Sequence, residues 1–248
     1  IPRPSEDLEV NVASGFISRF DGGKLVASDY SQLELRLLAE VTKEPAWYDG
    51  FQDPKFDPHQ ATADKTGLSR TDAKRINFGV VYGIGARKLA TQINKPYLEA
   101  RDALDSFWAE MCMIKDWFDD QHLEVRSHGQ VRTRAGRVRR LPDGRDLPQD
   151  DPAQWRAMRQ GPNFLIQGFA ADVVATAMVL LEERLQGMKS LLVNQVHDAL
   201  IVDTHPDEIE EVKVIVREVM EEDAPFQFSI SVPLKADVKT VDNYGEGG

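Results

Sequence analysis

The stretch that most constrains the fold of this 248-residue chain is 191–203, which predicts a tight β-hairpin. Two apolar runs, 191–196 and 199–203, are separated only by His197 and Asp198. A two-residue connection is typical of antiparallel neighbours. His-Asp is poor turn chemistry, because tight hairpin loops favour Asn-Gly and similar pairs that accept a positive φ. A broken local rule between two regular strands indicates a functional site, or strain that is compensated elsewhere.

A second strand, expected at 24–29, also ends in an acid, Asp29. The capping-box spacing of Ser31 and Glu34 predicts that a helix follows and runs to about residue 41. If this strand neighbours the hairpin in one sheet, Asp29 and Asp198 project from the same edge, where paired carboxylates suit Mg²⁺. Two such ions can serve phosphoryl transfer. The alternative is that each aspartate is an ordinary turn or cap residue, the commoner role of a single Asp at a strand end.

A helix is predicted over 70–83, with Ser69 as its candidate cap. Its residues Arg70, Lys74, Phe78 and Tyr82 recur every four positions and therefore share one face. Two cations followed by two rings suit a ligand with phosphates at one end and a base or sugar at the other, such as a nucleoside triphosphate. The alternative is an ordinary amphipathic helix whose rings pack inward and whose cations extend outward.

Charge is distributed unevenly along the chain, whose formal net charge is −11. Six arginines and no acid lie between 126 and 142, whereas 207–223 carries eight acids against two cations. The arginines fall on two short strands expected at 130–134 and 137–141, and alternating arginines on a ribbon can reach nucleic-acid phosphates without reading sequence. The alternative is a solvated surface ribbon.

The remaining pattern is mostly helical. A short strand is expected near 16–17, and a loop with turns at 43–60. Helices are expected at 59–66 (ended by Gly67), 96–110, 114–125, 150–159, 162–185 and 206–222. A last strand region is expected at 226–238.

Composition excludes several classes of protein. The single cysteine, Cys112, excludes an internal disulfide framework and a cysteine-rich zinc site, and it fits a reducing interior such as the cytoplasm. No apolar run is expected to reach the ~18 residues of a membrane span, and no signal-peptide pattern opens the chain. We therefore expect no membrane partner.

Three segments resemble the signature motifs of family A DNA polymerases, the family of bacterial DNA polymerase I and many phage or viral replicases. Residues 29–36 (DYSQLELR) resemble motif A, 70–83 resemble motif B, and 195–198 (QVHD) resemble motif C. The resemblance covers nearly the whole chain. It implies an α+β fold: a right-hand polymerase palm, built from an antiparallel sheet with helices, into which helical fingers are inserted. The implied division is palm at 1–58, fingers at 59–128 and palm again at 129–248, without thumb or exonuclease domains.

The resemblance also implies roles for individual residues. It predicts template-directed DNA synthesis from dNTPs on a primer-template, with Lys74 neutralising or protonating the departing pyrophosphate. Two Mg²⁺ ions, with Mn²⁺ as the alternative, would be held by Asp29, Asp198 and the backbone of Tyr30. Nucleotide contacts would come from Arg70, Lys74, His59, Gln32, Phe78, Tyr82 and Glu34. DNA contacts would come from Arg137, Arg159, Asn163, Gln167 and His197.

One departure from the family pattern stands at Ala199, where motif C usually continues with a glutamate. Glu34 is expected to exclude a ribose 2′-OH, which argues against the related reading of a single-subunit RNA polymerase. A two-metal nuclease and a non-catalytic fragment that binds nucleotide or nucleic acid remain open. A thumb and exonuclease region elsewhere, or a processivity partner, is a further expectation, as is a location in the host cytoplasm for a phage-encoded enzyme.

Overall fold

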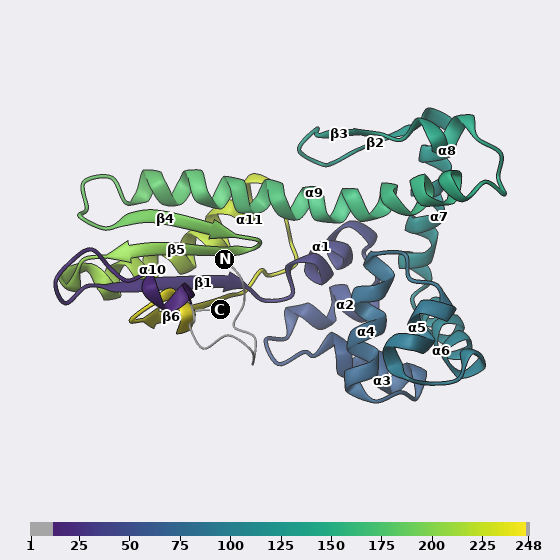
Figure 1. Cartoon of the computed structure of the whole chain (residues 1–248), viewed down its shortest axis with the longest axis horizontal. Coiled ribbons are helices and arrows are strands. Elements are labelled where there is room, and N and C mark those ends of the chain that lie inside the picture. The colour runs from purple at the N-terminus through teal and green to yellow at the C-terminus, as the bar shows by residue number, and fades with distance from the viewer. Residues whose placement is uncertain (1–11, 247–248) are drawn as a thin grey trace. The chain divides into compact units, whose positions relative to one another are not determined.

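The computed structural model describes residues 12–246. The chain divides into two compact units (Figure 1). Unit 1 combines the residues up to 33 with 171–230 and those from 234 onward, and unit 2 combines 34–170 with 231–233. The chain thus passes between the units four times.

Unit 1 is built on a four-stranded sheet in the order β4-β5-β1-β6, with every neighbouring pair antiparallel. Strand β1 spans Lys24–Tyr30, β4 spans Leu191–Val196, β5 spans Ala199–Thr204 and β6 spans Ala236–Val241. The predicted hairpin is therefore confirmed, and β1 is its neighbour. Asp29 lies opposite Ala199 on one side and opposite Asp237 on the other, so it sits in the middle of the sheet edge.

Alternation along the strands explains the core of unit 1. Leu25 and Ala27 pack on one face with Ile201 of β5 and Val241 of β6, as expected for inward positions two residues apart. Helix α10 (Ile209–Glu218) contacts β1 and β6. The shorter elements of the unit are η1 (Val12–Gly15), η3 (Pro206–Glu208), η4 (Val219–Asp223, a π-helical turn), α11 (Ala224–Gln227) and η5 (Tyr244–Glu246).

Unit 2 is mainly helical and is centred on an aromatic cluster. Trp47 and Phe107 are almost fully buried and pack edge to face, and Trp108 and Phe118 extend the cluster. Its elements are α1 (Leu33–Thr42), α2 (Pro45–Tyr48), η2 (Gly50–Gln52), α3 (Pro58–Thr66), α4 (Arg70–Val81), α5 (Ala86–Ile93), α6 (Tyr97–Glu110), α7 (Cys112–His128), β2 (Gln130–Arg132), β3 (Val138–Arg140), α8 (Pro142–Asp146) and the first part of α9.

Helix α9 (Pro152–Arg184) corrects the sequence-based prediction of two separate helices. Pro162 lies inside this helix. Its fixed φ is compatible with a helix, and its missing N–H costs one backbone hydrogen bond. Among the described residues α9 is also the one helix long and apolar enough to cross a membrane by length and composition, which corrects the expectation that no stretch would reach that length. Half of its apolar window is buried in the protein, as in a core helix, so this is a weak indication of a span.

Three further differences concern the ends of the chain and the short elements. The expected strand at 226–238 is wrong in its first half, where Pro225 lies in the short helix α11, and the strand β6 begins only at Ala236. The expected strand near 16–17 is an isolated bridge between Ile17 and Asn243. Helices α5 and α8 were not predicted, because each is too short to show a clear apolar period.

Candidate active site

The two predicted carboxylates lie together at one edge of the sheet in unit 1. Asp29 is near the end of β1, and Asp198 is in the two-residue turn between β4 and β5. The turn is tied to β1, because the backbone N–H of Tyr30 donates to the carbonyl of Asp198 at 3.4 Å. His197 takes a φ of +56°, the backbone cost that its poor turn chemistry indicated. Gln195 compensates by donating its side-chain amide to the His197 carbonyl.

The electrostatics of the pair follow from this proximity. The pKa of Asp29 is raised to about 6, first by burial and then by the charge of Asp198, with which its side chain shares a hydrogen bond. Asp237, opposite Asp29 in the register, raises the pKa further, whereas Lys239 lowers it. Lys239 also forms an ion pair with Asp237 at 2.8 Å. Sequence reasoning missed Asp237 and Lys239, because it placed the last strand too early.

The pair of Asp29 and Asp198 suits a divalent cation that takes most of its other ligands from water and substrate. Two carboxylates that compete for one proton gain from a cation that neutralises both. The described residues contain no group of three or more His, Cys, Asp or Glu side chains arranged around one metal position. Asp29 and Asp198 would be the two side-chain ligands of such an ion, and Mg²⁺ commonly completes a shell of this kind with water and substrate phosphates. The Tyr30 side chain is buried, and its hydroxyl donates to the carbonyl of Met220, so only its backbone is available to a metal.

In unit 2, helix α4 shows the predicted stripe. Ser69 caps it, because its Oγ accepts from the N–H of Asp72 at 3.1 Å. The buried face of α4 consists of other residues, namely Asp72, Ala73, Ile76, Asn77, Val80 and Val81. Arg70 and Lys74 are exposed, Phe78 is half-buried and Tyr82, just after the helix, is 48% exposed. Tyr82 therefore does not pack inward as the alternative of an ordinary amphipathic helix requires, whereas Phe78 packs partly inward.

Arg70 is held at the start of the stripe by an acid. Its Nε lies 2.5 Å from Asp57, which also caps α3 by accepting from the N–H groups of His59 and Gln60. Burial is the largest single effect on Asp57 and acts to raise its pKa. The hydrogen bond from Arg70 and the two backbone donors together outweigh it, so the pKa of Asp57 lies below its usual value. Lys74 lies 6.0 Å from the centre of the Phe78 ring. Lys74 is thus positioned over the ring, as a ligand with phosphates and a flat group requires.

His59 takes a different position from the one expected of a phosphate contact. It is only 2% exposed, and its ring lies 5.6 Å from that of Phe78. Its Nδ1 lies 3.0 Å from the amide nitrogen of Asn77, which also donates to the carbonyl of Pro58. Burial lowers the pKa of His59, with smaller contributions in the same direction from Arg70 and Lys74. His59 therefore supports Phe78 from behind, and Asn77 is a member of this group that sequence reasoning missed.

The end of motif B joins α1 and α9 through Tyr82. Its hydroxyl lies 3.3 and 3.4 Å from the two carboxylate oxygens of Glu34 and donates to them, and it accepts from the side-chain amide of Gln167 at 3.2 Å. Asn163 donates to the carbonyl of Val81 at 3.5 Å. The predicted contact between Glu34 and Tyr82 is therefore present.

Gly83 and Arg159 lie close together in this region. Gly83 has a φ of +64°, and a Cβ there would lie 3.0 Å from Cγ of Arg159, so both the backbone and the space favour glycine. Gln32, another predicted contact, immediately precedes α1 with a φ of +57° and is half-buried. Arg159, Asn163 and Gln167 of α9 therefore all lie at the end of α4. Their contact with primer and template stays a prediction.

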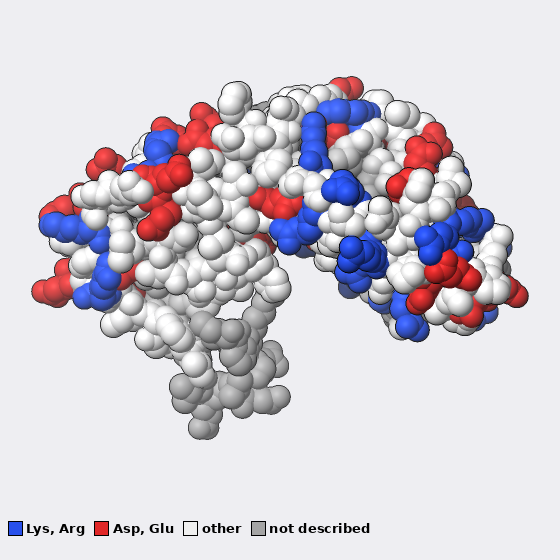
Figure 2. Space-filling view, turned by 90° about the horizontal axis from the view of Figure 1, so that it is seen from above, with Lys and Arg blue, Asp and Glu red and all other residues white. Residues whose placement is uncertain are grey.

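The predicted arginine hairpin is confirmed as β2 and β3, and its contact with DNA stays a prediction. Arg137 lies just before β3, and its backbone is fixed by Thr133, whose N–H donates to the Arg137 carbonyl at 2.8 Å. In Figure 2, which is seen from above relative to Figure 1, Lys and Arg gather in the area of the hairpin turn. The surface therefore carries local positive charge despite the acidic total.

A groove of about 1160 Å³ in unit 2 was not predicted from the sequence. It runs past α4 and α5 toward α7 and the start of α9, and it is lined by both rings and cations. These include Trp108, Phe118, Trp155, Lys74, Arg75, Lys88 and Lys115. No sequence signal could have found it, because its walls come from segments far apart along the chain.

Comparisons with known proteins agree with this arrangement. Residues 1–246 match the profile of DNA polymerase family A. DNA polymerase I of Deinococcus radiodurans is 34% identical over 98% of this chain and 26% of its own length, and the thermostable DNA polymerase I of Thermus filiformis is 35% identical over 93% of this chain and 28% of its own. The POL domain of Pol1 from M. smegmatis, solved in complex with a DNA primer-template and dNTP, has a TM-score of 0.85 at 25% identity, covering 97% of this chain and 44% of that one.

The chain thus spans about a quarter of the length of these curated relatives. The match nevertheless runs through every element that carries the carboxylate pair, the α4 stripe and the arginine hairpin. This chain belongs to DNA polymerase family A.

Proposed function

We propose that this chain carries out template-directed DNA synthesis, joining a dNTP to a primer 3′-OH with release of pyrophosphate. The observation that carries the proposal is the pair of carboxylates, Asp29 and Asp198, at adjacent strand ends and within hydrogen-bonding reach of one another. The relative from M. smegmatis was solved with primer-template and dNTP, which supports the same substrates for this chain.

Asp29, Asp198 and the backbone carbonyl of Tyr30 would hold the divalent ions. When bound, Mg²⁺ supplies positive charge that activates the attacking oxygen and stabilises the leaving one. The chain's own task is to hold both carboxylates in place. Two hydrogen bonds to the backbone of the turn do this: the Tyr30 N–H donates to the Asp198 carbonyl, and Gln195 donates to the His197 carbonyl.

Arg70 and Lys74 would bind the triphosphate. The Arg70–Asp57 ion pair is substantially exposed, with 53% and 31% of the two side chains accessible, so it is worth less than about 1 kcal/mol. A triphosphate carries more charge than one carboxylate and can replace Asp57 as the partner of the guanidinium. Lys74 would then neutralise or protonate the departing pyrophosphate. Phe78, supported by His59, would face the sugar and base, with Tyr82 beyond it.

Primer extension in Mg²⁺ tests the proposal. Asp198→Ala is expected to lower the rate by about 100-fold or more, because it removes one of two protein carboxylates from the metals. The matched control is Asp105→Ala, which removes an exposed acid on α6 of unit 2 and should leave the rate unchanged. Extension by Asp198→Ala at the wild-type rate would overturn the metal assignment.

The same assay separates the alternatives. A two-metal nuclease would degrade DNA without added nucleotides, although such an enzyme has no need of the α4 stripe. A non-catalytic fragment would bind dNTP without extending a primer, and it is favoured by Ala199, where the usual carboxylate is missing, and by the acidic net charge of the chain. Preference for ribonucleotides would indicate an RNA polymerase, against which Glu34 and its bond to Tyr82 argue.

A further inference from the structure

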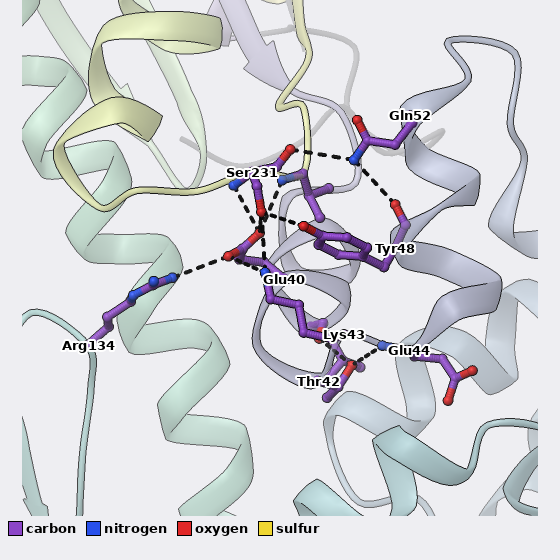
Figure 3. Close-up of polar contacts among 10 residues, drawn as sticks. Glu40, Thr42, Lys43, Glu44, Tyr48, Gln52, Arg134 and Ser231 are labelled. Atoms are coloured by element: carbon purple, nitrogen blue, oxygen red, sulfur yellow. Dashed lines mark hydrogen bonds and ion pairs between the residues drawn. The ribbon is translucent and has the colours of Figure 1, made fainter.

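A buried carboxylate on α1 joins three parts of unit 2. Only 2% of the Glu40 side chain is accessible. One of its oxygens accepts from Lys43 Nζ at 2.8 Å and from Arg134 Nη1 at 3.4 Å. The other accepts from the Ser231 N–H at 3.0 Å, the Ser231 hydroxyl at 2.9 Å and the Val232 N–H at 3.1 Å (Figure 3). Burial acts to raise the pKa of Glu40, but the bonds from Lys43, Val232 and Ser231 keep it below its usual value.

Glu40 therefore connects α1 to two segments that are distant in sequence. The first is the segment Ser231–Pro233, the only residues after Ala170 that belong to unit 2. Arg36, one turn earlier on α1, also binds this segment by donating to the carbonyl of Pro233 at 2.6 Å. The second is the arginine hairpin, which Glu40 reaches through Arg134 in the turn between β2 and β3.

Arg134 fixes the hairpin on α9. Its guanidinium carbon lies 6.0 Å from the centre of the Phe169 ring, and Arg139 lies 5.6 Å from that of Phe164. Between them Thr133 is buried, and a Cβ on Gly168 would lie only 2.9 Å from its methyl group, so the hairpin and α9 are in close contact there. Arg134 thus contacts protein on two sides, Glu40 and Phe169, although 44% of its side chain is accessible; the other arginines of the hairpin are also exposed.

We propose that Glu40 is a positioning residue for nucleic-acid binding: through Arg134 it holds the hairpin so that its exposed arginines, Arg132, Arg137 and Arg140, meet the phosphates of a primer-template. This inference rests on the proposed function, because it takes primer-template DNA as the ligand of the hairpin. It assigns to a buried acid a role in binding a polyanion.

The sign of the effect separates positioning from simple charge. Replacing Glu40 by glutamine removes a negative charge and keeps the shape. If charge alone mattered, Glu40→Gln would bind DNA more tightly, because the protein becomes more positive. If Glu40 positions the hairpin, the same variant binds DNA more weakly, because the phosphate contacts of the hairpin are no longer held in place.

The experiment measures the Kd of a primer-template by titration at two salt concentrations. Glu40→Gln and Arg134→Met are each expected to raise Kd about tenfold, the loss of one or two charged hydrogen bonds. The double variant should be no weaker than the weaker single one, because both break the same contact. The slope of log Kd against log salt should become shallower, and kcat at saturating primer-template should change by less than about twofold.

Two matched controls accompany these variants. Ser231→Ala removes the hydroxyl contact of Glu40 to the other segment, so it should lower Tm and leave Kd unchanged. Arg101→Met removes an exposed arginine of α6 that is paired with Asp102, and should also leave Kd unchanged. If Ser231→Ala weakens DNA binding as much as Glu40→Gln does, Glu40 has a structural role alone and the proposal is wrong.

A second measurement covers the case in which Glu40→Gln does not fold. Hydrogen exchange of Arg134→Met should show lost protection at the amides of Thr133 and Gly136, whose hydrogen bonds close the hairpin turn. Unchanged protection overturns the proposal. If wild type extends primers but Glu40→Gln binds DNA as tightly as wild type does, the role of Glu40 is overturned and the proposed function is not. A wild-type chain that binds no primer-template overturns the proposed function as well.

Discussion

The hydroxyl of Tyr82 donates to the carboxylate of Glu34 across 48 residues of sequence, at 3.3 and 3.4 Å from its two oxygens. The bond connects the first turn of α1 with the residue that ends α4, and Gln167 donates to the same hydroxyl from α9. The Tyr82 side chain, whose hydroxyl is bonded to both Glu34 and Gln167, has little freedom to move aside. The pair of Glu34 and Tyr82 therefore suits a steric role better than a merely electrostatic one.

Glu34→Ala should raise the use of ribonucleotides. Removing the carboxylate opens space for a 2′-OH, so we expect the ratio of ribonucleotide to deoxynucleotide incorporation to rise by about 10-fold to 100-fold. Tyr82→Phe, which removes only the hydroxyl that holds Glu34, should raise it less. Steady-state incorporation of matched nucleotide pairs measures the ratio. Equal discrimination in wild type and Glu34→Ala would remove the gating role.

Phe78→Tyr should increase the incorporation of dideoxynucleotides. Phe78 offers a half-buried ring without a polar atom, so a nucleotide without its 3′-OH finds no replacement for the lost hydrogen bond. A tyrosine hydroxyl at this position would supply one. We expect wild type to discriminate against dideoxynucleotides by about 100-fold or more and the variant to lose most of that discrimination. Equal use of both nucleotide types by wild type, with no gain in the variant, would contradict the prediction.

Local rules predicted the elements that carry the proposed chemistry. The two-residue gap at His197 and Asp198 required an antiparallel hairpin, and a strand ending at Asp29 needed only one pairing to bring the acids together. Likewise, Ser69 and the four-residue spacing from Arg70 to Tyr82 are local signals, and α4 begins and ends close to where they indicate. Pro162 misled the prediction because a proline often starts a helix, whereas here α9 continues through it.

Contacts between distant segments could not be predicted in this way. Asp237 reaches Asp29 because β6 pairs with β1, and no property of residues 226–238 reveals that register. Glu40 binds Arg134 and Ser231, which are 94 and 191 residues away, and its position on α1 shows only that it is an acid near a helix end. The burial of the His59 ring beside Phe78 was likewise not predicted, and its contact with the triphosphate stays a prediction.

Asp29→Asn should stabilise the metal-free protein while abolishing primer extension. The pKa of Asp29 is about 6 in the folded state against an ordinary value of 3.8, so between these values the folded state holds the proton more tightly than the unfolded one. The stability that this proton provides is present below about pH 4 and lost as the pH rises through 6. Above pH 6 the wild type therefore carries a cost that Asp29→Asn lacks.

Thermal unfolding in EDTA at pH 5 and pH 7.5 measures this effect. Asp29→Asn should unfold at a higher temperature than wild type at pH 7.5, with a smaller difference at pH 5. Added Mg²⁺ should raise the Tm of wild type and not that of the variant. Asp21→Asn, an exposed acid of the same unit, is the matched control and should follow wild type. A lower Tm for Asp29→Asn than for wild type in EDTA at pH 7.5 would contradict the argument.

The pH dependence of dNTP binding should distinguish two roles for His59. If its ring contacts the triphosphate, protonation adds a positive charge and tightens binding as the pH falls. If it supports Phe78, protonation weakens binding, because a charged imidazole can no longer accept from the Asn77 amide at 3.0 Å and is costly to bury. Burial has already lowered its pKa below 6.5, so the effect should appear only below that pH.

His59→Gln provides the comparison, because a glutamine can accept from Asn77 and never becomes charged in this range. The ratio of the two Kd values for a dNTP, wild type over variant, cancels the titration of the nucleotide's own phosphate and of groups such as Asp29. We expect this ratio to rise by about threefold to tenfold between pH 7 and pH 5.5. A ratio that falls would return His59 to the triphosphate, and it would require the ring to leave the buried position beside Phe78 whenever a nucleotide binds.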